Sequence, residues 1–193
     1  MDEQQIMAVV QRWAVYRDAG DWDRFRTVWH PDGRMSATWF RGSHEEFIRA
    51  SRQAFADGVR ILHFLGGTAV EVAGDRAIAQ TKMTITQRAV VHDVEVDVVC
   101  IGRFYDFFAR HEGEWRIARR QPIYEQDRMD PVDPAATLLL DAGRLSRFPV
   151  GYRHLAYLQE ANGQQVRQGL PGLNDDATKR LYEEGQLWLL DAV

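Results

Sequence analysis

The sequence of 193 residues contains a single cysteine, Cys100. One cysteine excludes an intramolecular disulfide and an all-cysteine metal site, and such scarcity is typical of proteins from a reducing compartment. The chain also lacks an uninterrupted apolar run of about 18 residues, the length that spans a bilayer. Its first residues carry neither the basic flank nor the apolar stretch of a signal peptide. We therefore expect a cytoplasmic protein that is neither exported nor inserted in a membrane.

The chain also has no large excess of charge of either sign. The 24 basic and 28 acidic residues are spread along the whole chain, and the net charge is -4. Proteins that bind nucleic acid or acidic lipid usually gather basic residues on one surface. We therefore expect neither a nucleic-acid partner nor a membrane partner, which leaves small molecules and other protein chains.

Several motifs that bind cofactors are missing. The sequence contains no Gly-x-Gly-x-x-Gly, no phosphate-binding loop and no Gly-x-Ser-x-Gly. Its six histidines show neither His-x-His nor His-Glu-x-x-His spacing. We expect no metal and no cofactor.

Helical periodicity fills the first third of the chain. Apolar residues at three- and four-residue spacing predict a helix that ends at Gly20 and a second over 22–29. We interpret 30–33, His-Pro-Asp-Gly, as a turn and 34–40 as extended. The capping-box sequence at 43–46 predicts a third helix that ends near Gly58.

From residue 60 onward, β-branched and aromatic residues predict four long strands, over 60–73, 76–91, 94–110 and 114–127. Short turns between them predict an antiparallel meander. A long sheet must twist, so helices on its concave side would enclose a pocket. We therefore predict an α+β fold, a cone-shaped curved antiparallel sheet packed on three N-terminal helices.

The composition changes after residue 128. We interpret 129–134, which contains two prolines, as a linker. Helices are predicted over 135–147, 151–161 and 175–191, with a loop at 169–174. We divide the chain into a cone domain, 1–128, and a C-terminal helical extension, 129–193, that packs on the cone, over its mouth or onto another subunit.

Three segments resemble a known family. They are Tyr-Arg-Asp-Ala-Gly-Asp-Trp-Asp at 16–23, Leu-His-Phe-Leu-Gly-Gly-Thr at 62–68 and Gly-Glu-Trp-Arg-Ile at 113–117. Together they resemble the SnoaL-like, scytalone dehydratase-like branch of the nuclear transport factor 2 superfamily. The resemblance covers about residues 5–128 and implies a cystatin-like fold.

The resemblance also implies a catalytic pair. In dehydratase- and dehydrochlorinase-type members, an aspartate at the end of the first helix orients a histidine on the strand after the helices, and Asp18 and His63 stand at those places. Imidazole, with a pKa of about 6.5, can accept a proton at neutral pH, and a carboxylate on its other nitrogen stabilises the imidazolium. Without the resemblance, the residues are those of a histidine that packs in the core and an aspartate that lies on the surface, which is the alternative.

Other positions depart from the family pattern. A second histidine of scytalone dehydratase falls here on Gln87 or Arg88, and its tyrosine before the helical aspartate is replaced by Arg17. Scytalone is therefore not the expected substrate. We predict that five residues bind the substrate: Tyr16, Gln87, Arg88, Phe104 and Tyr124.

The group that would act as an acid is not identified by the resemblance. Tyr105, Arg110, Tyr124 and Arg88 are candidates. Strand alternation places Arg110 on the same face as Phe104 and Phe108, so we predict that Arg110 is the third catalytic residue. A surface arginine at a strand end is the alternative.

These observations predict a cofactor-independent lyase, of the dehydratase or dehydrohalogenase type, or an isomerase that removes a proton from carbon of a small apolar substrate. The alternative is a noncatalytic protein of the same fold, either a small-molecule binder or a structural subunit beside a ring-hydroxylating oxygenase. The apolar end of the extension, 187–190, and the resemblance favour a homo-oligomer.

Overall fold

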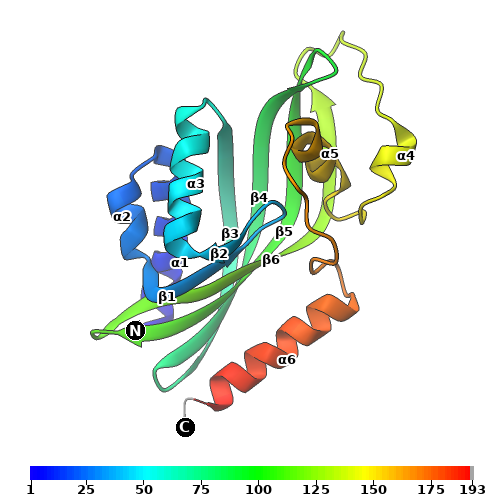
Figure 1. Ribbon diagram of the computed structural model, residues 1–193. Helices are drawn as coiled ribbons and strands as arrows, with labels where there is room; N and C mark the ends of the chain where they lie inside the picture. The colour runs from blue at the N-terminus through cyan, green and yellow to red at the C-terminus, as the bar shows by residue number, and fades with distance from the viewer. Residues whose placement is uncertain (192–193) are drawn as a thin grey trace.

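The computed structural model describes residues 1–191. Three helices, α1 (Asp2–Ala19), α2 (Trp22–Thr27) and α3 (His44–Ala56), lie against one face of a curved sheet (Figure 1). Gly20 ends α1 in a left-handed conformation, with φ of 71°. The capping box forms as predicted, because Ser43 and Glu46 each accept the other's backbone N–H at the start of α3. The three predicted N-terminal helices are confirmed.

The sheet has six strands in the order β2-β1-β6-β5-β4-β3. They are β1 (Trp29–Ser36), β2 (Arg41–Ser43), β3 (Arg60–Ala73), β4 (Arg76–Val91), β5 (Val94–His111) and β6 (Glu114–Pro131). The predicted meander from β3 to β6 is antiparallel, whereas β1 pairs with β6 in parallel. The α+β curved-sheet fold is confirmed.

Two interpretations of proline-containing segments are wrong. Residues 30–33 are not a turn but part of β1, where an irregular register between Trp29 and Arg34 accommodates the proline. Residues 129–131 are not a linker but the end of β6. The backbone N–H of Val132 donates to the carbonyl oxygen of Glu95. Because successive backbone N–H groups of a strand point to opposite sides, the nitrogen of Pro131 points away from β5, to a side where no described strand pairs with this part of β6.

The extension contains α4 (Ala142–Leu145), α5 (Arg153–Ala161) and α6 (Asp176–Leu190). The helix predicted over 135–147 is wrong except for α4, which begins only where Asp141 accepts the N–H of Arg144. Helix α5 packs against β6, β5 and β4, and α6 lies beside β4 and β3 (Figure 1). The extension therefore packs on the sheet rather than standing apart from it.

Strand alternation on β5 divides the apolar side chains between two clusters. Phe104 and Phe108 face the core that the helices cover, together with Trp13 of α1. Tyr105 and Phe107 point to the other face, where Leu181 of α6 covers them. The helices α1 and α6 therefore cover opposite faces of the sheet, and the predicted inward face of β5 is confirmed.

Candidate active site

Asp18 and His63 are in direct contact on the concave side of the sheet. Asp18 lies in the last turn of α1, and His63 lies near the start of β3. The Nδ1 atom of His63 is 2.8 Å from Oδ1 of Asp18, and the backbone N–H of His63 donates to Oδ2 at 2.6 Å. Only 6% of the His63 side chain and 15% of the Asp18 side chain are exposed. The two residues that the family resemblance singled out are thus joined by two hydrogen bonds.

This contact determines which nitrogen of His63 can act as a base. An ionised carboxylate only accepts hydrogen bonds, so Nδ1 of His63 carries the proton and Nε2 keeps its lone pair. Burial lowers the pKa of His63 below 6.5; the hydrogen bond and charge of Asp18 oppose that effect, and the cations of Arg17 and Arg120 add to it. The imidazole is therefore neutral at pH 7 and able to accept a proton.

Arg17 fastens the end of α1 to the same strand. Its Nη1 atom donates to the carbonyl oxygen of Ile61 at 3.1 Å and lies 3.5 Å from Oδ1 of Asp18. Burial lowers the pKa of Arg17, while the neighbouring carboxylate favours its charged form. Its Nε atom is buried and has no partner among residues 1–191. Arg17 thus positions Asp18 and leaves one donor free.

The cavity next to His63 is small. Its volume is about 40 Å³, and residues from both the cone and the extension line it, including Trp13, Gln87, Phe104, Tyr124, Leu155 and Gln159. One water needs at least roughly 10–15 Å³ of such space, whereas sites for small organic ligands are usually about 300–1,000 Å³. In this conformation the cavity has room for water but not for a substrate of ordinary size.

Three of the predicted substrate-binding residues line this cavity: Gln87, Phe104 and Tyr124. Tyr124 is almost completely buried, and this burial strongly raises the pKa of its phenol. The phenol therefore stays protonated and can donate a hydrogen bond at neutral pH. Of the four candidate acids, Tyr124 alone contributes to the cavity.

Arg110 is not at this site. Its guanidinium bonds to Asp2 at 2.7 Å, pairs with Asp75 at 3.2 Å and covers the ring of Trp115. Cys100 of β5 lies in the row of His63, so Arg110 is ten residues further along the strand, roughly 30 Å away. Strand alternation specifies the face of the sheet on which Arg110 lies, but not its position along a strand of 18 residues.

Tyr16, Arg88 and Tyr105 are also elsewhere. Tyr16 lies beneath the guanidinium of Arg24. It precedes Arg17 by one residue on α1, so its side chain points in a different direction from that of Arg17. Arg88 is exposed and forms two hydrogen bonds with Asp97, at 2.8 and 2.7 Å. Tyr105 lies on the outer face of β5 under α6. Adjacent strand residues face opposite sides of the sheet. Of the two positions that could correspond to the second histidine of scytalone dehydratase, Gln87 therefore faces the cavity and Arg88 does not.

A buried ion pair behind the cavity was missed. Asp106 and Arg120 have fully buried side chains joined by two hydrogen bonds of 2.7 and 2.6 Å. The guanidinium lies 4.2 Å from the ring centre of Trp13 and 4.1 Å from that of Phe104. Asp106 alternates with Phe104 and Phe108 on the inward face, and a carboxylate placed there requires a buried cation. An acidic residue at an inward-facing strand position could therefore have indicated a buried ion pair from the sequence.

Leu155 and Gln159 of α5 were missed for a different reason. They are more than 90 residues from His63 in sequence, and the helical pattern of α5 does not show which surface it covers. Both are buried, and the Oε1 atom of Gln159 has no partner among the described residues. The extension therefore closes the cavity.

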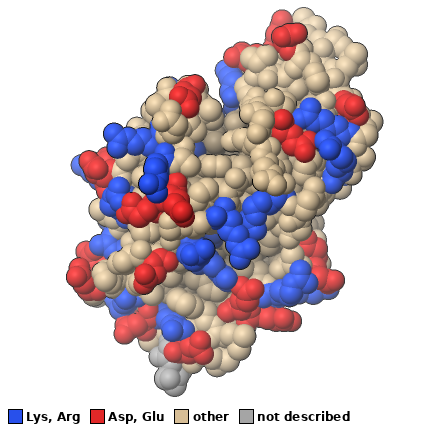
Figure 2. Space-filling view, viewed as in Figure 1, with Lys and Arg blue, Asp and Glu red and all other residues tan. Residues whose placement is uncertain are grey.

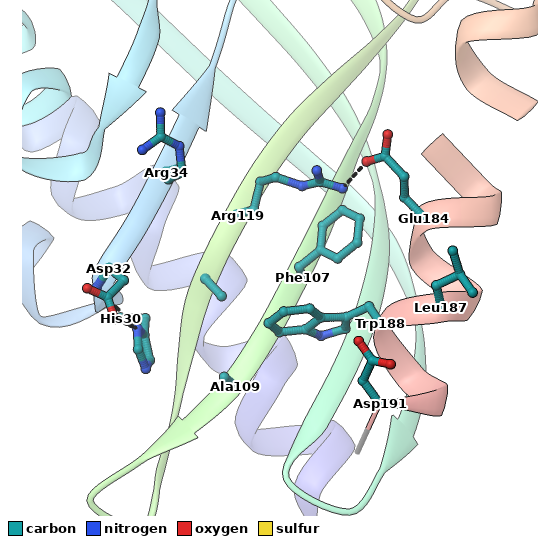
Figure 3. A pocket seen from close by; sticks show the side chains of 11 residues that line it. His30, Asp32, Arg34, Phe107, Ala109, Arg119, Glu184, Leu187, Trp188 and Asp191 are labelled. Atoms are coloured by element: carbon teal, nitrogen blue, oxygen red, sulfur yellow. Dashed lines mark hydrogen bonds and ion pairs between the residues drawn. The ribbon is translucent and has the colours of Figure 1, made fainter. Parts of the chain in front are cut away.

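A larger hollow, of about 540 Å³, lies on the other face of the sheet, between β1 and α6 (Figure 3). Phe107 and Trp188 form its apolar floor, and Arg119 pairs there with Glu184 at 2.6 Å. Arg34 is on the opposite rim. No residue lines both this hollow and the His63 cavity, so the two spaces are separate, and none of the site residues predicted from the sequence lines the hollow.

Within residues 1–191, no group of three or more His, Cys, Asp or Glu side chains is placed to hold a metal ion. Cys100 is buried, and burial strongly raises the pKa of its thiol. None of the described helices has the length and apolarity needed to cross a membrane.

Comparison with known proteins agrees with this fold. The SnoaL-like domain matches residues 1–121. Pea pathogenicity protein 2 of Fusarium vanettenii is 34% identical over 200 residues, which cover 98% of this chain and 86% of that protein. A protein without an assigned function from Emericella nidulans is 31% identical over 205 residues, with the same coverage. Both similarities therefore include the extension.

Two solved structures share the fold at low identity. A putative scytalone dehydratase from Novosphingobium aromaticivorans has a TM-score of 0.56 and 12% identity, with 71% of this chain and 95% of that chain covered. A hexachlorocyclohexane dehydrochlorinase, LinA type 2, has a TM-score of 0.57 and 11% identity, with 73% and 94% covered. The matched domain, the fungal relatives and this architecture agree: the chain belongs to the family of SnoaL-like domain proteins.

Proposed function

We propose that this protein is a cofactor-independent lyase or isomerase in which His63 removes a proton from carbon. The observation that carries the proposal is the contact between Nδ1 of His63 and the carboxylate of Asp18, which leaves Nε2 as the acceptor. No described residue hydrogen-bonds to that Nε2 atom. A neutral base that is held by an acid and faces a largely apolar cavity has the properties that proton abstraction requires.

The proposed reaction uses few groups. Nε2 of His63 takes a proton from the substrate, and the electron pair of that C–H bond becomes the new double bond as water or halide leaves with its own bonding pair. Asp18 stabilises the imidazolium. Departing hydroxide takes a proton from the imidazolium or from Tyr124 and leaves as water, whereas a departing halide needs no proton. In an isomerisation, His63 returns its proton to another carbon of the same molecule. The substrate is small and largely apolar, because aromatic and aliphatic side chains make up most of the cavity wall.

Substrate binding requires Leu155 and Gln159 to move outward, because a cavity of about 40 Å³ cannot contain the reacting molecule. A groove of about 450 Å³ lies next to it and shares Arg17, Trp39, Ile61, Gln87 and Gln159 with its wall. These five residues separate the two spaces. The substrate therefore enters from the groove as the extension shifts.

Exchange of carbon-bound hydrogen tests the proposal before a natural substrate is identified. The protein is incubated in D₂O with a panel of small cyclic ketones, and deuterium at the carbon next to the carbonyl is measured by NMR. We expect the wild type to accelerate exchange and His63→Ala to reduce the acceleration by about 100-fold or more. His111→Ala is the control, because this histidine lies at the far end of β5. Equal exchange rates with wild type and His63→Ala would contradict a base at residue 63.

One observation favours the noncatalytic alternative. The cavity holds only about 40 Å³, and the extension supplies part of its wall, as expected of a structural subunit that performs no chemistry. The alternative predicts no exchange with any ketone in wild type or in a variant with smaller side chains at positions 155 and 159. A structural subunit would in addition co-purify with a larger oxygenase chain.

We also propose that the protein forms a homo-oligomer through α6. Leu187 and Leu190 of this helix are 61% and 67% exposed. Sedimentation of the wild type should give more than one chain per particle, and Leu187→Asp with Leu190→Asp should give single chains. A monomeric wild type would exclude this assembly.

A further inference from the structure

The groove beside the His63 cavity has an unusual lining. It runs between α3 and α5, where Figure 2 shows the molecule hollowed between its two upper lobes and lined mainly by uncharged atoms. Five carboxamide side chains contribute to it: Gln53, Gln87, Gln159, Asn162 and Gln164. They come from α3, β4, α5 and the segment that follows α5, so tertiary structure brings them together.

The cation of the groove is already paired. Arg17 is held by Asp18 and the carbonyl oxygen of Ile61, so an anionic ligand would find no free counter-charge there. Asp57 accepts a hydrogen bond from Nε2 of Gln53 at 2.9 Å, and no described cation forms an ion pair with it. The carboxamides offer both N–H donors and carbonyl acceptors, which suits hydroxyl groups, because each hydroxyl both donates and accepts.

Two buried polar atoms at the inner end of the groove lack partners. They are Oε1 of Gln159, an acceptor, and Nε of Arg17, a donor. Gln159 as a whole residue is 3% exposed, and Arg17 is 6% exposed. Buried polar groups are normally hydrogen-bonded, since leaving one unpaired costs about 1–3 kcal/mol. Both residues also line the His63 cavity. A ligand hydroxyl at this boundary can donate a hydrogen bond to Oε1 of Gln159 or accept one from Nε of Arg17.

We propose that this groove binds a neutral, polyhydroxylated ring and that Gln159 recognises one of its hydroxyl groups. The half-buried indole of Trp39 supplies an aromatic surface for the apolar face of such a ring. Binding of this ring in the groove does not rest on the proposed function, and the ring is not required to be the molecule that reacts at His63.

Side-chain amide NMR tests the proposal directly, because each carboxamide gives its own NH₂ signals. The probes are three six-membered rings of similar size, namely methyl glucoside, which is neutral, glucuronate, an anion, and glucosamine, a cation. We expect methyl glucoside to shift the signals of the groove amides saturably, with at least fivefold weaker binding of glucuronate and no tighter binding of glucosamine. Absence of saturable shifts with methyl glucoside, equal binding of glucuronate, or tighter binding of glucosamine through Asp57 overturns the proposal.

Matched variants locate the site. Gln159→Leu and Gln164→Leu should each raise the dissociation constant of methyl glucoside at least fivefold. Because Gln164 is exposed, its replacement should leave the fold intact. Gln126→Leu, an exposed glutamine on β6 outside the groove, should leave it unchanged. Unchanged binding in both groove variants refutes the site. His63→Ala should bind methyl glucoside as the wild type does, so the loss of exchange activity and the loss of ring binding are separate results.

Discussion

Asp127 of β6 holds His154 of α5 by two hydrogen bonds. Its Oδ1 atom is 2.8 Å from Nδ1 of His154, and its Oδ2 atom accepts the backbone N–H of the same residue at 2.7 Å. Leu155 donates a third hydrogen bond to Oδ2, at 2.8 Å. The fully buried carboxylate thus satisfies two N–H groups of the first turn of α5, which carries Leu155 and Gln159 over the cavity.

Asp127→Asn should loosen this attachment. An amide carries no charge and offers one acceptor oxygen in place of two, so we expect stability to fall by about 1–3 kcal/mol and backbone hydrogen exchange in 153–161 to accelerate at least tenfold. Exchange followed by mass spectrometry measures this. Asp130→Asn is the control on the same strand, because its ion pair with Arg128 is exposed. Unchanged exchange in α5 would mean that apolar packing alone holds the helix.

The pH profile of the proposed activity should follow His63. Burial lowers the pKa of this imidazole, and only its neutral form accepts a proton, so activity should decline on acidification with a midpoint below 6.5. Asp18→Asn removes the carboxylate that favours the imidazolium, so we expect an even lower midpoint and a lower maximal rate. The NMR titration of the Cε1 proton of His63 reports the same pKa without a substrate. A midpoint above 6.5 would contradict this assignment.

Breaking the ion pair between Asp106 and Arg120 should destabilise the core. Asp106→Asn leaves the buried guanidinium without a countercharge, for which we expect a loss of about 3–5 kcal/mol in urea unfolding. Replacing both partners with apolar residues, as Asp106→Leu with Arg120→Met, should recover much of that loss. Arg128→Ala, which breaks an exposed pair, should cost less than about 1 kcal/mol. A similarly small cost for Asp106→Asn would show that water or another group compensates the guanidinium.

Gly102 should be required for the packing of β5 on β6. A Cβ atom there would overlap the carbonyl oxygen of Ile123, at the irregular register next to Ile101. Backbone atoms cannot give way easily, so Gly102→Ala should cost more than about 2 kcal/mol of unfolding free energy. Gly67→Ala is the matched control, because nothing lies within 4 Å of a Cβ at Gly67. Equal melting temperatures of the two variants would show that the bulge rearranges.

Local patterns were sufficient for most of the fold. The capping box at Ser43 and the short turns between the long strands depend on neighbouring residues, so the sequence predicts them directly. The prolines at 31 and 131 misled the interpretation, because proline is tolerated where a strand has a bulge or no neighbour to receive its missing N–H. Whether a strand has a neighbour at that point is not a local property.

The sequence by itself determined the three N-terminal helices, the long strands, the face of β5 that turns inward and, through the family resemblance, the pairing of Asp18 with His63. Each depends on periodicity or on a short motif. Tertiary structure decided that Gln87 rather than Arg88 reaches the cavity, that Arg110 bonds to Asp2 instead, and that Gln159 closes the cavity from the far end of the chain. The physical reason is that periodicity specifies the direction of a side chain, whereas its partners depend on strand register and on the surface where a distant helix packs.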